Sequence, residues 1–378
     1  MAEGTGRPHV GPGGDVPGST LQNPAAERRS TVLDGHKVRY WFYDVDRRPK
    51  PLLLMVHGFR GDHHGLQLVA DRLREHYHVV VPDLPGFGRS EPFPDRPHDV
   101  AGYVEFLRGF VEDLTGGAVH DGRIPDDPVP GGTAGDDDSA GTSRAGRVGH
   151  GIVVLGHSFG SVLAAHFAAA HPAMVERLVL VNPICRPPLD GEQAVLSRLT
   201  ATYYRLGRAL PGPLGRRLLS SGLVTDAMSE VMTKSQDPQV RGYVRHQHRA
   251  YFTPVPDRDV LMQAYEASIS HTVAEVAVRL TMPTLLVVGD EDEIGSVADQ
   301  RRMASWIRRH RLEVLEGVGH LIHYEAPARA AELVRDFLTS PAPEPVELHD
   351  QLPAADLAAP NTSQFTGLQR IVRRERRR

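Results

Sequence analysis

A serine lies between two glycines at positions 156–160, where the sequence reads Gly-His-Ser-Phe-Gly. The apolar run Ile152 to Leu155 precedes this stretch and is rich in β-branched residues, which predicts a short buried strand. The alanine-rich segment Ser161 to Ala170 follows it and predicts a helix of small residues. A strand and a helix joined by G-x-S-x-G form a nucleophile elbow, whose sharp turn aims the serine hydroxyl at the helix N-terminus. Ser158 is therefore a candidate nucleophile.

A serine hydroxyl needs a general base to accept its proton, and a carboxylate to orient that base. His320, in Gly-Val-Gly-His, follows the last apolar strand pattern and is a candidate base, although the chain has 20 histidines. The strand pattern before it ends in Gly289-Asp290-Glu291-Asp292-Glu293, which offers four acidic side chains. Serine, acid, histidine is the chain order in which this kind of elbow supplies its three groups. The pattern alone leaves the choice among the four acids open.

Strand and helix patterns alternate along the part of the chain that must position these residues. Apolar runs predict further strands at His36–Tyr43, Leu52–Val56, Val79–Pro82, Arg177–Asn182, Thr284–Val288 and Leu312–Leu315, and helical spacing marks Val100–Leu114. Such alternation predicts an α/β protein with a mostly parallel central sheet flanked by helices. Ligands bind such sheets beyond the carboxyl ends of the strands, and each candidate residue follows one of those ends.

Three segments lack hydrophobic periodicity and are rich in glycine, proline and polar residues: 1–29, 116–149 and 341–378. They bury too little apolar surface to offset the entropy lost on ordering, so we expect an N-terminal tail, an insertion and a C-terminal tail that are all disordered. The last of them ends in the basic stretch RIVRRERRR, which we expect to be solvated. Residues 30–340, without the insertion, are of a size that suits one domain.

Composition restricts the partners and the compartment. The net charge of −4 gives no electrostatic reason to expect a nucleic-acid partner. The single cysteine, Cys185, cannot form an internal disulfide, and neither a signal peptide nor an apolar run long enough to span a bilayer is visible. We therefore expect a cytoplasmic protein that acts on a small molecule. His63-His64 and His246-Gln247-His248 lack the spacing of known metal motifs, so neither a metal nor a cofactor is expected.

Taken together, these motifs resemble the α/β-hydrolase superfamily over roughly residues 30–340, outside the insertion. Besides the elbow, the resemblance rests on His57-Gly58-Phe59, on the segment 83–90 (Asp-Leu-Pro-Gly-Phe-Gly-Arg-Ser), on Gly289-Asp290-Glu291-Asp292 and on Gly319-His320, all in the expected order. It implies the α/β-hydrolase fold, with a helical lid inserted at 186–275 that sets substrate choice.

The resemblance also implies roles for single residues. Ser158, His320 and Asp292 would form a catalytic triad, with Asp292 preferred to Asp290 as the acid. The backbone N–H groups of Phe59 and Phe159 would form the oxyanion hole. His57 and the segment 83–90 would belong to the loop architecture, and Asp290 would organise its turn.

These groups predict a serine hydrolase that cleaves an ester-type acyl bond of a small or medium apolar substrate through an acyl-enzyme. The same groups serve carbon–carbon bond hydrolases of the meta-cleavage-product type, cofactor-free haloperoxidases and acyltransferases. A carbon–carbon hydrolase needs basic or polar groups for a substrate carboxylate, and Arg60, Arg186, Arg205 and Arg245 leave that possibility open. The alternative from another class is a catalytically inactive ligand-binding protein of the same fold. The sequence does not indicate an oligomeric state.

Overall fold

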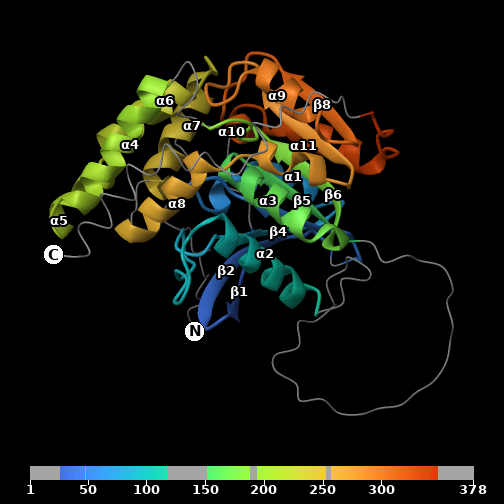
Figure 1. Cartoon of the computed structure of the whole chain (residues 1–378), viewed down its shortest axis with the longest axis horizontal. Coiled ribbons are helices and arrows are strands. Elements are labelled where there is room, and N and C mark those ends of the chain that lie inside the picture. The colour runs from blue at the N-terminus through green and yellow to red at the C-terminus, as the bar shows by residue number, and fades with distance from the viewer. Residues whose placement is uncertain (1–25, 47, 117–150, 188–193, 253–256, 348–378) are drawn as a thin grey trace, which may run out of the picture.

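An eight-stranded sheet lies at the centre of the computed structural model, which describes residues 26–46, 48–116, 151–187, 194–252 and 257–347 (Figure 1). The strands lie in the order β1-β2-β4-β3-β5-β6-β7-β8. Their bounds are β1 Glu27–Leu33, β2 His36–Tyr43, β3 Leu52–Val56, β4 His78–Pro82, β5 Ile152–His157, β6 Val175–Val181, β7 Thr284–Gly289 and β8 His310–Leu315. The first two strands pair antiparallel, β2 also pairs antiparallel with β4, and the other pairs are parallel. The predicted α/β class with a mostly parallel sheet is confirmed.

The central strands form from short apolar runs that are buried on both faces. Every residue of β3, β4, β5 and β7 is buried. Alternate side chains of β3 enter different cores, with Leu54 in one and Leu53 and Met55 in the other. A strand covered on both faces loses the polar alternation of a surface strand, which is why these runs are apolar throughout.

Helices cover both faces of the sheet (Figure 1). Side chains of α2 (Val100–Leu114), α3 (Phe159–Ala170) and α9 (Val297–Ala304) belong to the core that contains Leu54. Side chains of α1 (Gln67–Leu73), α10 (Ile322–Glu325) and α11 (Pro327–Thr339) belong to the core that contains Leu53. The sheet is therefore the middle of three layers, and its loops carry the candidate residues.

Between β6 and β7, the described residues form five α-helices, which stand together beside the sheet (Figure 1). We call them the lid helices: α4 Ala194–Ala209, α5 Gly212–Leu219, α6 Gly222–Met232, α7 Pro238–Gln247 and α8 Arg258–Ser270. They fall within 186–275, the segment predicted to form a lid. In the described part of the chain, no helix has the length and apolarity needed to cross a bilayer.

Three features of the fold differ from the sequence-based expectations. The domain begins before residue 30, because β1 starts at Glu27. This edge strand is polar and largely exposed, so backbone pairing with β2 forms it where no hydrophobic pattern marks it. At the other end, residues 341–347 are described, and the Val346 N–H donates to the Arg308 carbonyl at 2.8 Å. The short helix α1 was also not predicted. The remaining parts of the segments predicted to be disordered (1–25, 117–149 and 348–378) lie outside the described residues.

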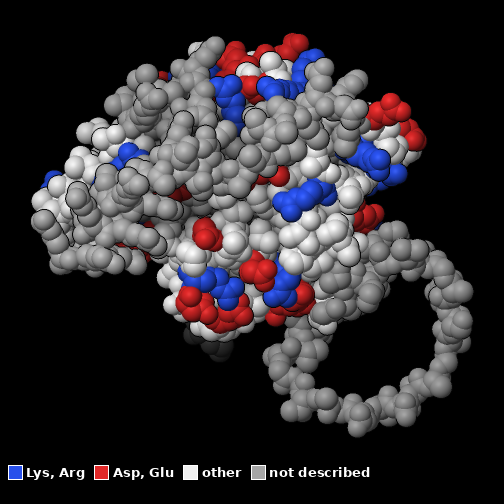
Figure 2. All heavy atoms as spheres, viewed as in Figure 1, with Lys and Arg blue, Asp and Glu red and all other residues white. Residues whose placement is uncertain are grey.

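Charged side chains of both signs share the surface. On the face seen in Figure 2, Lys and Arg side chains of the described residues are interspersed with Asp and Glu side chains. Ion pairs also form elsewhere among the partly exposed side chains of the described residues, such as Arg108 with Glu112 at 2.6 Å. This face therefore carries mixed charge, in keeping with the small net charge of the chain.

Candidate active site

Ser158 occupies a strained turn between β5 and α3. Its backbone has φ 55° and ψ −122°, a conformation that residues with a side chain rarely adopt. The turn is tight enough to require both flanking glycines. A Cβ on Gly156 would collide with the carbonyl group of Gly160, and a Cβ on Gly160 would collide with the carbonyl groups of Val56 and His57. The glycines of the sequence motif therefore have a direct steric cause.

Replacing Gly160 by alanine is expected to destabilise the fold by about 1–3 kcal/mol, because the added methyl group meets backbone atoms that cannot rotate away. Gly109 in α2 is a matched control, since a Cβ built there meets nothing within 4 Å. Gly109→Ala should stabilise the protein by about 0.5–1 kcal/mol through helix propensity. Urea unfolding of both variants measures the difference, and equal stabilities would contradict the packing described here.

The three residues of the predicted triad lie in one hydrogen-bonded series. His320 Nε2 is 2.8 Å from Ser158 Oγ, and His320 Nδ1 is 2.9 Å from Asp292 Oδ2. His320 and Asp292 are buried, whereas Ser158 is partly exposed to the cavity. Loops that follow β5, β7 and β8 supply the three side chains, so the parallel sheet brings together residues far apart in the sequence.

The two aspartates in the loop after β7 have different hydrogen-bond partners. Asp292 faces His320 and accepts the Ile294 N–H at 2.8 Å, which holds the carboxylate in place. Asp290 instead accepts the Gly317 N–H at 2.7 Å and so stabilises the turn after β8. The geometry thus pairs the preferred acid with the histidine and places the other aspartate at the turn.

Burial and charge act in opposite directions on His320. Burial lowers the pKa of the imidazole, while the charge of Asp292 and its hydrogen bond raise it, and the net pKa lies above its usual value. The pair therefore favours an imidazolium held between a carboxylate and a hydroxyl. A base in this setting can take a proton from Ser158 and keep its ring orientation while charged.

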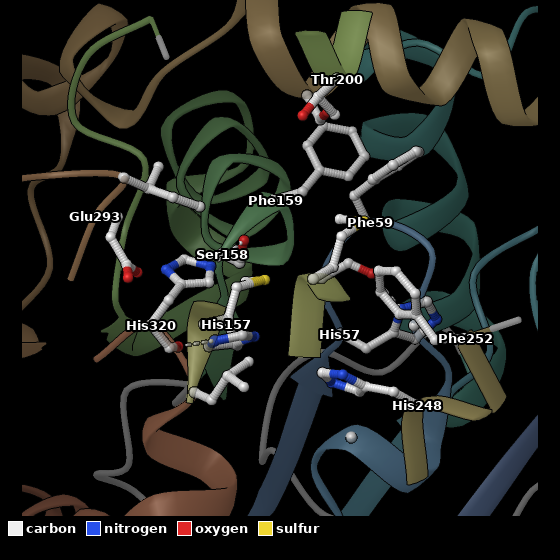
Figure 3. A pocket seen from close by; sticks show the side chains of 18 of the residues that line it. His57, Phe59, His157, Ser158, Phe159, Thr200, His248, Phe252, Glu293 and His320 are labelled. Carbon is white, nitrogen blue, oxygen red and sulfur yellow. Dashed lines mark hydrogen bonds between the residues drawn. The ribbon is translucent and has the colours of Figure 1, made fainter. Parts of the chain in front are cut away.

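Two buried residues that the sequence interpretation left without a role hold the His320 loop. His157 Nε2 donates to the backbone carbonyl of His320 at 3.1 Å (Figure 3), and burial lowers the pKa of His157 to about 3, so its ring is neutral. Asn182 follows β6 at φ 41°, donates to the Gly319 carbonyl at 2.9 Å and accepts the Gly289 N–H at 2.8 Å. No sequence motif marks these contacts, because they join loops more than 100 positions apart.

The candidate oxyanion donors come from the elbow itself and from the loop after β3, which packs against it. Phe159 is the first residue of α3, where backbone N–H groups have no acceptor within the helix. Phe59 lies in the loop after β3, which packs on the elbow so closely that a Cβ on Gly58 would be 3.2 Å from Ser158 Cβ. Both phenylalanines line the cavity described below (Figure 3).

The loops before the elbow are held by His57 and Asp83, as their architectural interpretation predicts. His57 Nε2 accepts the Leu84 N–H at 2.9 Å, so its Nδ1 donates to the Gly58 carbonyl at 2.8 Å. Asp83 is fully buried and accepts the backbone N–H groups of His63 and Arg89 at 2.9 and 2.7 Å. These contacts fix the loop that carries Phe59.

A cavity of about 820 Å³ opens above Ser158, between the sheet and the lid helices (Figure 3). Its wall is mainly apolar. Of the aromatic and methionine residues in the segment 186–275, those lining the cavity are Tyr204, Met228, Met232, Tyr251, Phe252 and Tyr265. Tyr243 and Met262 are instead buried in the packing of the lid and core. The cavity suits an apolar organic molecule of moderate size.

The arginines near the cavity have structural partners. Arg60 is buried and donates to the Phe252 carbonyl at 2.8 Å and to the carbonyl of Leu219, which ties the Phe59 loop to the lid helices. Arg186 lines the cavity and pairs with Asp299 at 3.0 Å. Both guanidinium groups therefore already donate hydrogen bonds within the protein, and that of Arg186 is also paired with a carboxylate.

Within the described ranges, one cluster of side chains has the spacing of metal ligands. Ligand atoms of Asp62, His63 and His64 all lie within 4.8 Å of one another. In this structure His63 Nδ1 contacts Asp83 at 2.9 Å, His64 Nδ1 contacts Asp62 at 3.0 Å, and Asp62 also accepts the His64 N–H. We therefore interpret these three side chains as groups that stabilise their own loop.

A sequence model of the alpha/beta hydrolase family matches residues 53–333, well over half of the chain. The chain belongs to this family. The match confirms the resemblance seen in the sequence motifs. It also identifies the chain as an enzyme, a hydrolase with the α/β fold.

This α/β hydrolase is similar to two relatives that carry different activities in their names. It is 25% identical over 299 residues to monoacylglycerol lipase abhd6-A of Xenopus laevis, covering 77% of this chain and 76% of the lipase. It is 27% identical over 276 residues to 2-hydroxymuconate semialdehyde hydrolase of Pseudomonas sp. (strain CF600), covering 72% of this chain and 80% of that enzyme.

A solved structure supports the fold of this hydrolase. The enol-lactonase from Burkholderia xenovorans LB400 superimposes with a TM-score of 0.61 at 18% identity, over 82% of this chain and all of that one. At this level of identity the likeness concerns the fold alone.

Proposed function

We propose that this hydrolase cleaves carboxylic esters of small or medium apolar acids through a serine acyl-enzyme. The observation that carries the proposal is the continuous series from Ser158 Oγ to His320 to Asp292, at 2.8 and 2.9 Å. A serine hydroxyl that donates to a buried, carboxylate-oriented imidazole is the arrangement needed for nucleophilic acyl transfer.

The proposed reaction has two halves. Ser158 Oγ attacks the acyl carbon while His320 Nε2 takes its proton, and the tetrahedral oxyanion accepts the N–H groups of Phe59 and Phe159. Collapse expels the alcohol, which receives the proton from His320. Water then attacks the acyl-enzyme with His320 as its base, and the acid is released with Ser158 restored. Asp292 stabilises the imidazolium in both halves.

The cavity supports a neutral apolar substrate. Carboxylates at its wall come from Asp62, Glu293 and Asp299 in addition to Asp292, and Arg186 is paired with Asp299. Asp299 is paired with Arg186 and Glu293 with Lys234, so among the described residues the wall offers a substrate carboxylate no cation that lacks a partner, and Arg60 already donates to the Phe252 carbonyl. This arrangement favours an ester over the anionic diketones of carbon–carbon hydrolases.

A series of p-nitrophenyl esters tests the substrate class. We expect kcat/KM to rise about tenfold or more from acetate to octanoate, since each methylene buried in an apolar cavity contributes up to about 0.8 kcal/mol. The cavity wall that receives the chain includes Met228 and Phe252. Absence of turnover for every ester, together with turnover of a vinylogous diketone, would favour the carbon–carbon alternative instead.

A further inference from the structure

One lid residue contacts the neighbours of both the proposed acid and the proposed base. Lys234 lies in the segment between α6 and α7, and its ammonium donates to the carboxylate of Glu293, the residue after Asp292. The backbone N–H of Lys234 donates to one oxygen of Glu325, whose other oxygen accepts the Gly319 N–H at 3.0 Å, next to His320. The lid is thus joined to both loops at the same place.

Glu293 lies close enough to His320 to act on its charge. The carboxylate lines the cavity beside the imidazole, and in Figure 3 it lies on the side of the ring away from Ser158. Burial lowers the pKa of His320 and Asp292 raises it, and these two effects are the larger ones. The negative charge of Glu293 adds to the raising effect of Asp292. The Glu293 and Lys234 side chains are only 17% and 23% exposed, so solvent screens their charges incompletely.

The groups that face His320 come from the elbow, the acid loop, α10 and the lid. His157 and His323 are buried with lowered pKa values, so they are neutral near pH 7. The charged groups that contact His320, its neighbour Gly319 or the Glu293 carboxylate are Asp292, Glu325 and Lys234, with Glu293 itself. Glu325 accepts backbone N–H groups, which leaves Glu293 and Lys234 as an ion pair beside the base.

We propose that Lys234 is a positioning residue that couples the lid to His320 by neutralising Glu293 beside the imidazole. The inference rests on the proposed function, because it assumes that His320 is the base. With Lys234 in place, Glu293 stabilises the imidazolium less, and the neutral imidazole needed to activate Ser158 persists to lower pH. Displacement of this part of the lid leaves Glu293 uncompensated and holds a proton on His320.

The rate at which a fluorophosphonate labels Ser158, followed against pH, tests the coupling without a substrate. Labelling requires neutral His320, so its fall at low pH reports the titration of that residue. Lys234→Met should move this fall to higher pH by about half a pH unit, and Glu293→Gln should move it to lower pH by a similar amount. The double variant removes both charges and should return the profile close to that of the wild type.

Arg208→Met is the matched control, because Arg208 pairs with Asp259 within the lid helices and its side chain is 57% exposed. It should leave the profile unmoved. The coupling would be overturned if the single variants lowered the labelling rate at every pH without moving the pH of the fall. It would also be overturned if both single variants moved that pH in the same direction, or if the double variant did not return it to the wild-type value. Absence of labelling in the wild type would instead overturn the proposed function, and the coupling with it.

Discussion

Ser158→Ala is expected to lower kcat for a p-nitrophenyl ester by about 10⁴- to 10⁶-fold. The hydroxyl is the group that forms the acyl-enzyme, and His320 has no other hydroxyl hydrogen-bonded to its Nε2 among the contacts of the described residues. Because the variant removes one atom from the cavity wall, the cavity should still bind ester. The expected signature is therefore lost turnover with retained affinity, measured by steady-state kinetics and by binding of a product acid.

The experiment must distinguish a loss of catalysis in Ser158→Ala from a loss of folding. Ser158 holds a strained backbone conformation, and alanine adopts that conformation no more readily than serine does. The melting temperature should therefore stay close to that of the wild type. Ser305→Ala is a suitable control, since this half-buried serine caps the end of α9 far from the triad contacts and should leave kcat unchanged. Activity within tenfold of wild type in Ser158→Ala would exclude a serine acyl-enzyme.

Asp292→Asn is expected to lower kcat by about 10⁴-fold, because an amide favours the wrong imidazole tautomer and no longer stabilises the imidazolium. Asp292 also raises the pKa of His320, against the lowering effect of burial. In the wild type, activity should therefore fall on the acid side with a midpoint above pH 6.5, the ordinary value for histidine. Asp292→Asn should move that midpoint to lower pH, which a pH profile of kcat/KM measures.

Asp290→Asn provides the matched control two positions away. Its carboxylate accepts the Gly317 N–H at 2.7 Å and does not contact His320, so the substitution should cost stability more than activity. We expect kcat within about threefold of the wild type and a modest fall in melting temperature. If Asp290→Asn lost the larger part of the activity and Asp292→Asn did not, the acid would be misassigned.

The central part of the fold was predictable because its strands are buried on both faces. Runs such as Leu52–Val56 and Thr284–Val288 are apolar throughout, and the structure places strands at both. The edge strand β1 escaped prediction because it is stabilised by backbone pairing and exposes polar side chains. Hydrophobic pattern reports burial, so an element that buries little leaves little trace in the sequence.

In the candidate site, too, some residues were predictable from the sequence and others were not. Ser158, Asp292 and His320 stand in local motifs, each just after a strand, and the structure brings them within hydrogen-bonding distance of one another. His157, Asn182 and Lys234 act on partners more than 50 positions away, through contacts that only the folded chain creates. No spacing rule could reveal them.

The most direct test of the central claim is to locate the adduct of a fluorophosphonate probe. The protein is treated with the probe at pH 8, digested, and the labelled peptide is identified by mass spectrometry, with Ser158→Ala processed in parallel. We predict a single adduct on Ser158 in the wild type and none in the variant, because this serine lies at the cavity and contacts an imidazole that is itself paired with a carboxylate. An adduct on another residue, or an unlabelled wild-type protein, would contradict the assignment of Ser158 as the nucleophile.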